Sequence, residues 1–203
     1  KKMNIKKKII NFLKFKKIKV GILGQGYVGL PLSMLFGKKG IEVYGFDTNK
    51  RKINLLKQGK SFLSSYSNQE IKDNTENCKF FSSFKKINDC NILIICVPTP
   101  LKNKTEPDLS YLKNAVNLIK KNIPTKQKRV IILESTSYPG TTNDHLIKKF
   151  NNNLIGKDLF IGFSSERINP GGVNEKNLSS IPKVVSGHTK SCVRIISNIY
   201  SLV

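Results

Sequence analysis

A glycine-rich turn between an apolar segment and an amphipathic one constrains the fold of this 203-residue chain more than any other feature. Residues 18–23 are rich in apolar and β-branched side chains and predict a strand. The turn, GQGYVG, spans residues 24–29, and residues 30–36 follow with apolar side chains at helical spacing. A strand, a turn with GxGxxG spacing and a helix together predict the first unit of a dinucleotide-binding fold.

Each glycine of the turn has a predicted role. Gly24 allows the tight turn, Gly26 lets the backbone approach a pyrophosphate, and Gly29 lets the helix pack close to the strand. The N-terminus of the new helix carries unpaired N–H groups and a partial positive charge, which favour a diphosphate. The predicted cofactor contacts in the turn are Gly24, Gln25, Gly26, Tyr27, Val28 and Gly29.

An acidic residue follows the next predicted strand. Residues 41–46 alternate in the manner of a strand and end on Asp47, at about the spacing that the dinucleotide fingerprint requires. A carboxylate there accepts hydrogen bonds from the adenosine ribose hydroxyls and repels a 2′-phosphate. The sequence therefore predicts NAD rather than NADP as cofactor. The alternative is a glycine turn in another kind of α/β protein, with Asp47 only capping the next helix.

Strands and helices alternate along the rest of the chain, which predicts an α/β fold with a doubly wound parallel sheet of the Rossmann type. Residues 18–187 are expected to form this domain, after a basic lead-in helix at 1–17. Further strands are predicted at 79–81, 91–97, 129–133, 158–163 and 183–186. Helices are predicted at 49–56, around 68–73, from 108–110 through Ile119, and through Leu146 and Ile147.

Polar clusters follow three of the predicted strands, at 98–100, 134–142 and 164–172. Ligands of such sheets bind at the carboxyl ends of the strands, so these clusters are expected to converge on the nicotinamide end of the cofactor. The plainer alternative for each cluster is a polar loop built from turn residues.

The formal net charge of +23 raises the question of nucleic-acid binding. Only four of the 36 basic residues are arginines, whereas sequence-specific readers rely on arginine forks. The lysines are scattered along the whole chain. We therefore expect no specific nucleic-acid partner, although weak polyanion binding stays open as an alternative.

The cysteines and histidines give no metal-site pattern. The four cysteines form no CxxC pair, and His145 and His188 are isolated from them, so no metal is expected. Unpaired cysteines fit a reducing cytoplasm. No apolar run reaches the roughly 18 residues of a membrane span.

Six segments together resemble the UDP-glucose/GDP-mannose dehydrogenase family of nucleotide-sugar 6-dehydrogenases. They occur in the family's order over most of the chain. The ESTSYPGTT and ERINPG segments most resemble the branch that acts on UDP-N-acetylhexosamines, with UDP-N-acetylglucosamine as the expected substrate. A UDP-glucose enzyme or a non-catalytic NAD-binding module are the alternatives. The matching segments are GQGYVGLPL (24–32), VPTPL (97–101), EPDLSY (106–111), ESTSYPGTT (134–142), SSERINPG (164–171) and IPKVVSG (181–187).

The resemblance implies two successive NAD-dependent oxidations of the sugar C6 alcohol, with a cysteine thioester that is then hydrolysed. It places Pro98 and Thr99 against the cofactor and Thr136 near a water at the reacting carbon. It makes Glu166 the base for thioester hydrolysis and Arg167 a candidate for substrate binding. Glu134 occupies a position where relatives differ and receives no role.

This chain departs from the family in what it lacks. The family's nucleophilic cysteine belongs to a later segment, and the surroundings of Cys192 do not match it. Ser165 also replaces the proline that relatives carry before the glutamate. We therefore expect the chain to be the cofactor-binding part of a longer protein, with 188–203 beginning the connection to a second, substrate-binding domain outside it. The resemblance implies a homo-oligomer for the full-length protein.

Overall fold

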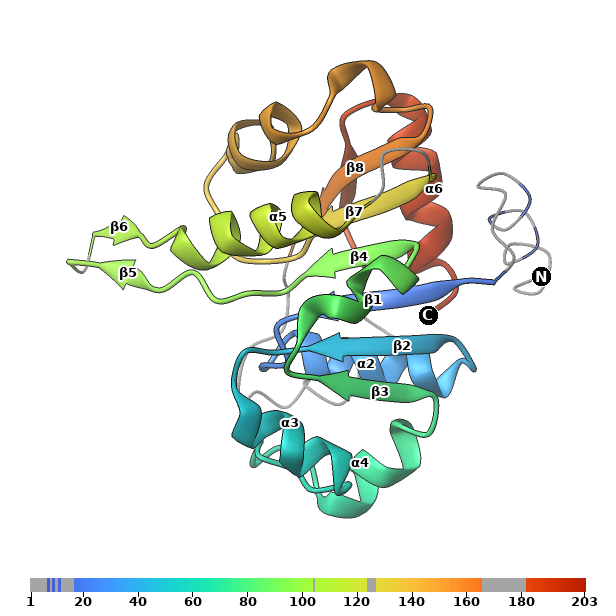
Figure 1. Ribbon diagram of the computed structural model, residues 1–203, viewed down its shortest axis with the longest axis vertical. Helices are drawn as coiled ribbons and strands as arrows, with labels where there is room; N and C mark the ends of the chain where they lie inside the picture. Colours follow the sequence, from blue (N-terminus) through green and yellow to red (C-terminus); the bar gives the residue numbers. More distant parts are fainter. Residues whose placement is uncertain are drawn as a thin grey trace.

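The computed structural model of the protein describes residues 7, 9, 11, 17–103, 105–123, 127–165 and 182–203. A seven-stranded sheet forms its centre, with strand order β3-β2-β1-β4-β7-β8-β9 (Figure 1). The strands are β1 (Lys19–Leu23), β2 (Glu42–Phe46), β3 (Cys78–Phe81), β4 (Ile92–Ile95), β7 (Arg129–Leu133), β8 (Leu159–Ser164) and β9 (Val185–Gly187). The order reverses between β1 and β4, which is the topological switch point where doubly wound sheets bind their ligands.

Helices cover both faces of the sheet, as the alternating pattern predicts. Figure 1 shows α2 behind the sheet and α5 in front of it. The helices are α2 (Gly29–Lys38), α3 (Lys50–Lys57), α4 (Asn68–Asn74), α5 (Ser110–Asn122) and α6 (Lys190–Tyr200), and the short turns are η1 (Phe84–Asp89), η2 (Thr142–Leu146), η3 (Ile147–Lys149) and η4 (Asn152–Leu154). The helix expected through Leu146 and Ile147 is therefore only a π-helical turn followed by a 3₁₀ turn.

Six strands run parallel, but the expectation of a wholly parallel sheet is wrong at β9. This strand pairs antiparallel with β8, with Gly162 opposite Gly187 and Ser164 opposite Val185. An antiparallel neighbour needs no helical crossover, so the chain leaves β8 and returns beside it at the same edge. A Cβ added at Gly187 would lie 2.6 Å from the amide nitrogen of Val193, so the glycine allows α6 to pack directly on β9.

The main core lies between the sheet and its helices, and the apolar runs of the sequence form its middle. Every residue of β4 and β7 is buried, as expected for central strands covered on both faces. The first residue of β7, Arg129, is the one charged residue of these two strands, and it is only 2% exposed. Ile9 also belongs to this core, while most of the predicted lead-in helix at 1–17 lies outside the described residues.

A second apolar cluster joins α2, α3, α4 and the edge strand β3. Its helices begin at polar caps that the sequence supplies. The Asn49 side chain accepts a hydrogen bond from the backbone of Lys52, and Ser67 and Glu70 form a reciprocal capping box at α4. The buried members of the cluster are Leu30, Met34, Ile53, Leu56, Leu63, Ile71 and Phe80.

A short hairpin that the pattern of the sequence does not predict extends from the carboxyl end of β4. It consists of β5 (Leu101–Lys102) and β6 (Glu106–Pro107), which pair antiparallel, and Figure 1 shows it projecting away from the sheet. Asn103 in its turn has a φ of 49°, a left-handed conformation that asparagine tolerates. After the hairpin, Asp108 accepts a hydrogen bond of 2.9 Å from the backbone of Ser110 at the start of α5.

Candidate functional site

The glycine turn lies at the switch point, held between the carboxyl ends of β2 and β4. Gly24 has a φ of 92°, a conformation that L side chains rarely adopt. Its amide donates a 2.7 Å hydrogen bond to the carbonyl of Phe46. A Cβ at Gly24 would also lie 2.5 Å from the carbonyl oxygen of Cys96, so a glycine is required here for both conformation and space.

Gly26 and Gly29 differ sharply in their surroundings. A Cβ at Gly29 would lie 1.8 Å from the carbonyl oxygen of Gly24, because the first turn of α2 packs directly on the loop. A Cβ at Gly26 would meet no atom within 4 Å, so its glycine is not needed for packing within the described part of the chain. This open space fits a pyrophosphate that approaches the backbone at Gly26.

The N-terminus of α2 lies at the same turn and has no acidic side chain near it in sequence. Val28 precedes the helix without a side-chain cap, and the first turn of α2 contains no acidic residue. The amide of Leu30 already donates to the carbonyl of Gly26 at 3.1 Å and Pro31 has no N–H, so the helix dipole is what favours an anion there. Tyr27 is 47% exposed beside them, while Val28 is partly buried against the main core.

The backbone of Gln25 lies in the glycine turn after β1, and its side chain is fully buried. Its Nε2 donates to the carbonyl of Ile22 at 3.1 Å, and its Oε1 accepts from the hydroxyl of Ser33 at 3.0 Å. A Cβ at Gly45 would lie 2.8 Å from the amide carbon of this side chain, so Gly45 makes room for it. Only the main chain of Gln25 is therefore left for the cofactor contact that the sequence predicts.

The carboxylate of Asp47 binds two backbone amides. Its Oδ2 accepts from Gln25 N at 2.9 Å and its Oδ1 accepts from Asn49 N at 2.8 Å. The cap of α3 is Asn49 and not Asp47, which argues against the alternative of a simple capping role. Each carboxylate oxygen has a second lone pair, so both can still accept from ribose hydroxyls.

The loops after β4 and β7 meet on the other side of the switch point. The hydroxyl of Thr99 donates a 2.7 Å hydrogen bond to the carbonyl of Thr136. Pro98 and Thr136 are exposed, and Thr99 is partly buried. The third polar cluster is described only at Ser164 and Ser165, and both Glu166 and Arg167 lie outside the described residues.

Glu134, which the sequence left without a role, is the centre of a buried polar network at this edge. It directly follows β7 and has no exposed surface. The ammonium of Lys183 donates to its Oε1 and the hydroxyl of Tyr200 donates to its Oε2. Burial, together with the charge of Glu134, raises the pKa of Tyr200 well above its ordinary value. The only sequence signal for this network is a carboxylate immediately after the apolar run at 130–133.

All four cysteines are free thiols, and none is an exposed residue. Burial raises the pKa of both Cys78 and Cys90 to about 12. A nucleophilic cysteine acts as the thiolate, so these two thiols are unsuited to that role. Cys192 lies inside α6, where it is completely buried.

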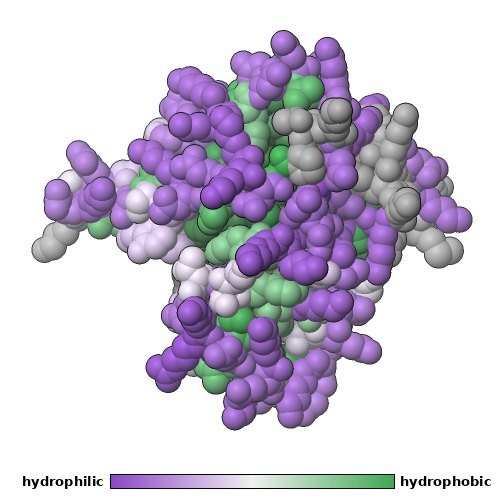
Figure 2. All heavy atoms as spheres, in the orientation of Figure 1, coloured by the Kyte–Doolittle hydropathy of each residue, from purple (hydrophilic) through white to green (hydrophobic). Residues whose placement is uncertain are grey.

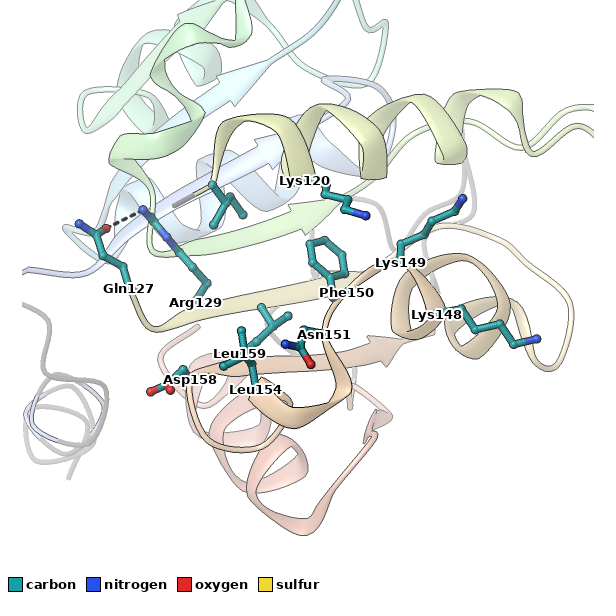
Figure 3. Close-up of a pocket in the computed structure, with 11 residues that line it drawn as sticks. Lys120, Gln127, Arg129, Lys148, Lys149, Phe150, Asn151, Leu154, Asp158 and Leu159 are labelled. Carbon is teal, nitrogen blue, oxygen red and sulfur yellow. Dashed lines mark hydrogen bonds between the residues drawn. The ribbon is translucent and has the colours of Figure 1, made fainter. Parts of the chain in front are cut away.

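A cavity of about 450 Å³ lies at the opposite edge of the sheet, at the amino ends of β7 and β8 (Figure 3). Phe150, Leu154 and Leu159 give it apolar walls, and Lys120 and Lys149 lie near its rim. Arg129 lies beside it, with a guanidinium that donates at 2.8 Å to Gln127 and at 2.8 Å to the carbonyl of Asn88. This cavity is separate from the glycine turn and is not the predicted cofactor site.

The charge of the chain is spread over its surface. Exposed lysines occur on α2, α3, α5 and α6, for example Lys38, Lys57, Lys121 and Lys190. Figure 2 shows hydrophilic residues over most of one face, with hydrophobic residues visible mainly across its middle. Within the described residues there is no cluster of three or more potential metal ligands and no helix long and apolar enough to cross a membrane.

Similar proteins of known activity match this chain along most of its length. A UDP-N-acetyl-D-glucosamine 6-dehydrogenase from Pseudomonas aeruginosa is 39% identical over 188 residues, which are 91% of this chain and 43% of the relative. A protein of the same name from Salmonella typhi is 35% identical over 187 residues, again 91% of this chain and 43% of the relative. The chain thus spans less than half the length of these curated relatives.

Solved structures show the same partial coverage. A UDP-N-acetylmannosamine dehydrogenase from Pyrococcus horikoshii superposes with a TM-score of 0.81 at 25% identity, covering 91% of this chain and 44% of that one. A GDP-mannose dehydrogenase from Pseudomonas aeruginosa gives 0.80 at 26% identity, covering 90% and 44%. The family model described as "UDP-glucose/GDP-mannose dehydrogenase family, NAD binding domain" matches residues 18–203. The chain therefore belongs to the UDP-glucose/GDP-mannose dehydrogenase family, of which it contains the NAD-binding domain.

Proposed function

We propose that this chain supplies the cofactor-binding half of a nucleotide-sugar 6-dehydrogenase that makes a uronic acid for polysaccharide biosynthesis. The substrate is UDP-N-acetylglucosamine, whose C6 alcohol is oxidised to the carboxylate. The observation that carries this proposal is the 39% identity to the Pseudomonas aeruginosa enzyme of that name over nearly the whole chain. The glycine turn and Asp47, which share one edge of the sheet, support it.

The residues of the turn fit NAD. Gly26 leaves room above the backbone for the pyrophosphate, at the uncapped N-terminus of α2. Asp47 accepts hydrogen bonds from the adenosine ribose and disfavours the 2′-phosphate of NADP. Pro98 and Thr99, in the loop after β4, lie toward the nicotinamide. When bound, NAD accepts a hydride from the sugar carbon.

The loops on the nicotinamide side handle the water that the reaction consumes. Oxidation of an alcohol to an acid removes two hydrides, which reduce two molecules of NAD, and takes up one water. Thr136 holds this water near the reacting carbon, and Glu166 removes its proton during hydrolysis of the thioester. Arg167 binds a charged group of the substrate. The cysteine that forms the thioester comes from the second half of the protein, together with most of the UDP-sugar site.

The same proposal covers the setting of the reaction. The protein with both halves is a homo-oligomer that works in the cytoplasm, where UDP-sugars and NAD are available.

Two measurements test this function. The chain alone is titrated with NAD and with NADP, and NAD is expected to bind more tightly. The chain is then joined to the remaining half from the Pseudomonas aeruginosa relative and assayed for NADH formation from UDP-N-acetylglucosamine and from UDP-glucose. Faster oxidation of UDP-glucose would assign the other substrate. NAD binding without turnover of either sugar would favour a non-catalytic NAD-binding module.

A further inference from the structure

We propose that Glu134 is a positioning residue for the hydrolytic step, because its buried network ties the loop that carries Thr136 to Lys183 and to the end of α6. This inference rests on the function proposed above and adds a residue to it. Three segments far apart in the sequence meet at this carboxylate. Lys183 is 49 residues away along the chain and Tyr200 is 66 residues away.

The burial of Glu134 is costly and is fully compensated by partners. A carboxylate without exposure loses its hydration. This loss costs roughly several kcal/mol per ion unless an opposite charge and hydrogen bonds replace the water. Lys183 supplies the charge and Tyr200 supplies a hydroxyl, one to each carboxylate oxygen. Apolar side chains of similar size would often fill such a site with equal or greater stability. Stability alone therefore does not explain a charged network here.

The first segment that the network holds is the loop after β7. The amide of Glu134 donates a 2.8 Å hydrogen bond to the carbonyl of Ile95, which ties the loop to the end of β4. Two residues later, the carbonyl of Thr136 accepts the 2.7 Å hydrogen bond from Thr99. Thr136 is thus held between a buried carboxylate below it and the cofactor-side loop beside it.

The second segment is the stretch from Lys183 into β9. It lies beside the end of β8, because Ser165 N donates a 3.3 Å hydrogen bond to the carbonyl of Val184. Lys183 is the neighbour of Val184, and Glu166 is the neighbour of Ser165. The ion pair of Lys183 with Glu134 therefore joins this stretch, and the end of β8 beside it, to the loop that carries Thr136.

The third segment is the end of α6. Tyr200 lies in the last turn of this helix, which packs on β8 and β9. Its hydroxyl locks the helix to the same carboxylate. One buried residue therefore joins the Thr136 loop to Lys183 and to α6, and fixed surroundings of this kind are what precise placement of a catalytic group requires.

The test compares Glu134→Gln with wild type in the active protein that joins this chain to its second half. Both hydride transfers precede hydrolysis of the thioester, so a defect confined to hydrolysis leaves a burst of two NADH per active site. We expect this burst to keep its full amplitude while the steady-state rate falls by about 100-fold. The dissociation constant of NAD is expected to stay within about twofold, because the turn at Gly24–Gly29 does not involve Glu134.

Control variants separate positioning from folding. Tyr200→Phe removes one hydrogen bond and keeps the packing, so it is expected to lower the steady-state rate by about tenfold with the burst intact. Glu76→Gln, at an exposed residue, is expected to behave as wild type. Equal losses of burst amplitude and steady-state rate in Glu134→Gln, or a wild-type steady-state rate, would overturn the inference. If wild type itself forms no NADH from any UDP-sugar, the proposed function fails instead.

Discussion

The backbone amide of Gln25 donates a 2.9 Å hydrogen bond to Oδ2 of Asp47, which joins the glycine turn to the carboxyl end of β2. The carboxylate holds the turn in position with one lone pair on each oxygen. Its remaining lone pairs are the acceptors that we propose for the ribose of the cofactor. This coupling explains why an acidic residue at this point in the sequence is informative about both fold and cofactor.

Replacement of Asp47 by Ala is expected to weaken NAD binding by about tenfold, or 1.4 kcal/mol, and to reduce the preference for NAD over NADP. The variant loses the ribose acceptor and the charge that repels a 2′-phosphate. Titration of both cofactors by calorimetry measures the change. Asp73→Ala, in the exposed part of α4, is the matched control and should leave both affinities unchanged. An unchanged cofactor preference in Asp47→Ala would refute the role given to this residue.

The two glycines of the turn that differ in their surroundings give a paired prediction. Gly26→Ala should leave the free energy of unfolding within about 0.5 kcal/mol of wild type, because its Cβ meets nothing. It should nevertheless weaken NAD binding by about tenfold. Gly29→Ala should destabilise the fold by about 3 kcal/mol, because its Cβ would overlap the carbonyl of Gly24. Urea unfolding and NAD titration of both variants check the pair, and the reverse pattern would contradict it.

The pH dependence of stability should include a contribution from Glu42. Hydrogen bonding to Lys17, helped by the charge of Lys19, lowers the pKa of Glu42 to about 2 from its usual value near 4.5. The unfolded chain therefore takes up this proton at higher pH than the folded chain does. The stabilisation is complete above about pH 5 and is lost as the pH falls from there to about 2.

Glu42→Gln tests this contribution. Lys17 is exposed, so solvent screening limits the effect, and we expect a loss of about 1 kcal/mol at pH 7 that shrinks toward zero near pH 2. Urea unfolding at several pH values, with Glu76→Gln as control, measures the difference. A difference that stays constant down to pH 2 would show that the ion pair is not its source.

The chain alone is expected to bind NAD without sustained NADH formation from UDP-N-acetylhexosamines. Turnover by the chain alone that is abolished by Cys192→Ser would contradict our assignment of the chain as half of an enzyme.

The buried thiols should also react slowly. Cys78 and Cys90 have pKa values of about 12, so at pH 8 they should react with a disulfide reagent more than about 100-fold slower than a free cysteine. Thiol titration before and after unfolding measures this protection.

The sequence predicted those elements of the fold in which every residue of the segment has the same surroundings. β4 and β7 are buried on both faces, so their apolar runs identified them as central strands. The turn at Gly24–Gly29 was equally clear, because its glycines meet local steric requirements. The strand β9 has three residues at the edge of the sheet, too few to show whether it runs parallel or antiparallel.

Glu134 could not have been assigned from the sequence for a different reason. A charged residue after a strand normally indicates a solvated loop, and the partners that allow its burial lie far along the chain. Gln25 shows the converse, because its place in the glycine turn predicts a cofactor contact while Ser33 and Ile22 hold its side chain inside. In both cases long-range packing decides the environment of a polar side chain.

The antiparallel edge strand also has an evolutionary consequence. Because β8 and β9 are neighbours that run in opposite directions, the connection between them begins and ends at one point on the sheet. Residues can be added to or removed from such a connection without a change in the position of any strand. The entropy cost of closing a loop rises only slowly as the loop lengthens. A family with this arrangement can therefore vary the connection between β8 and β9 in length while the glycine turn at the switch point stays unchanged.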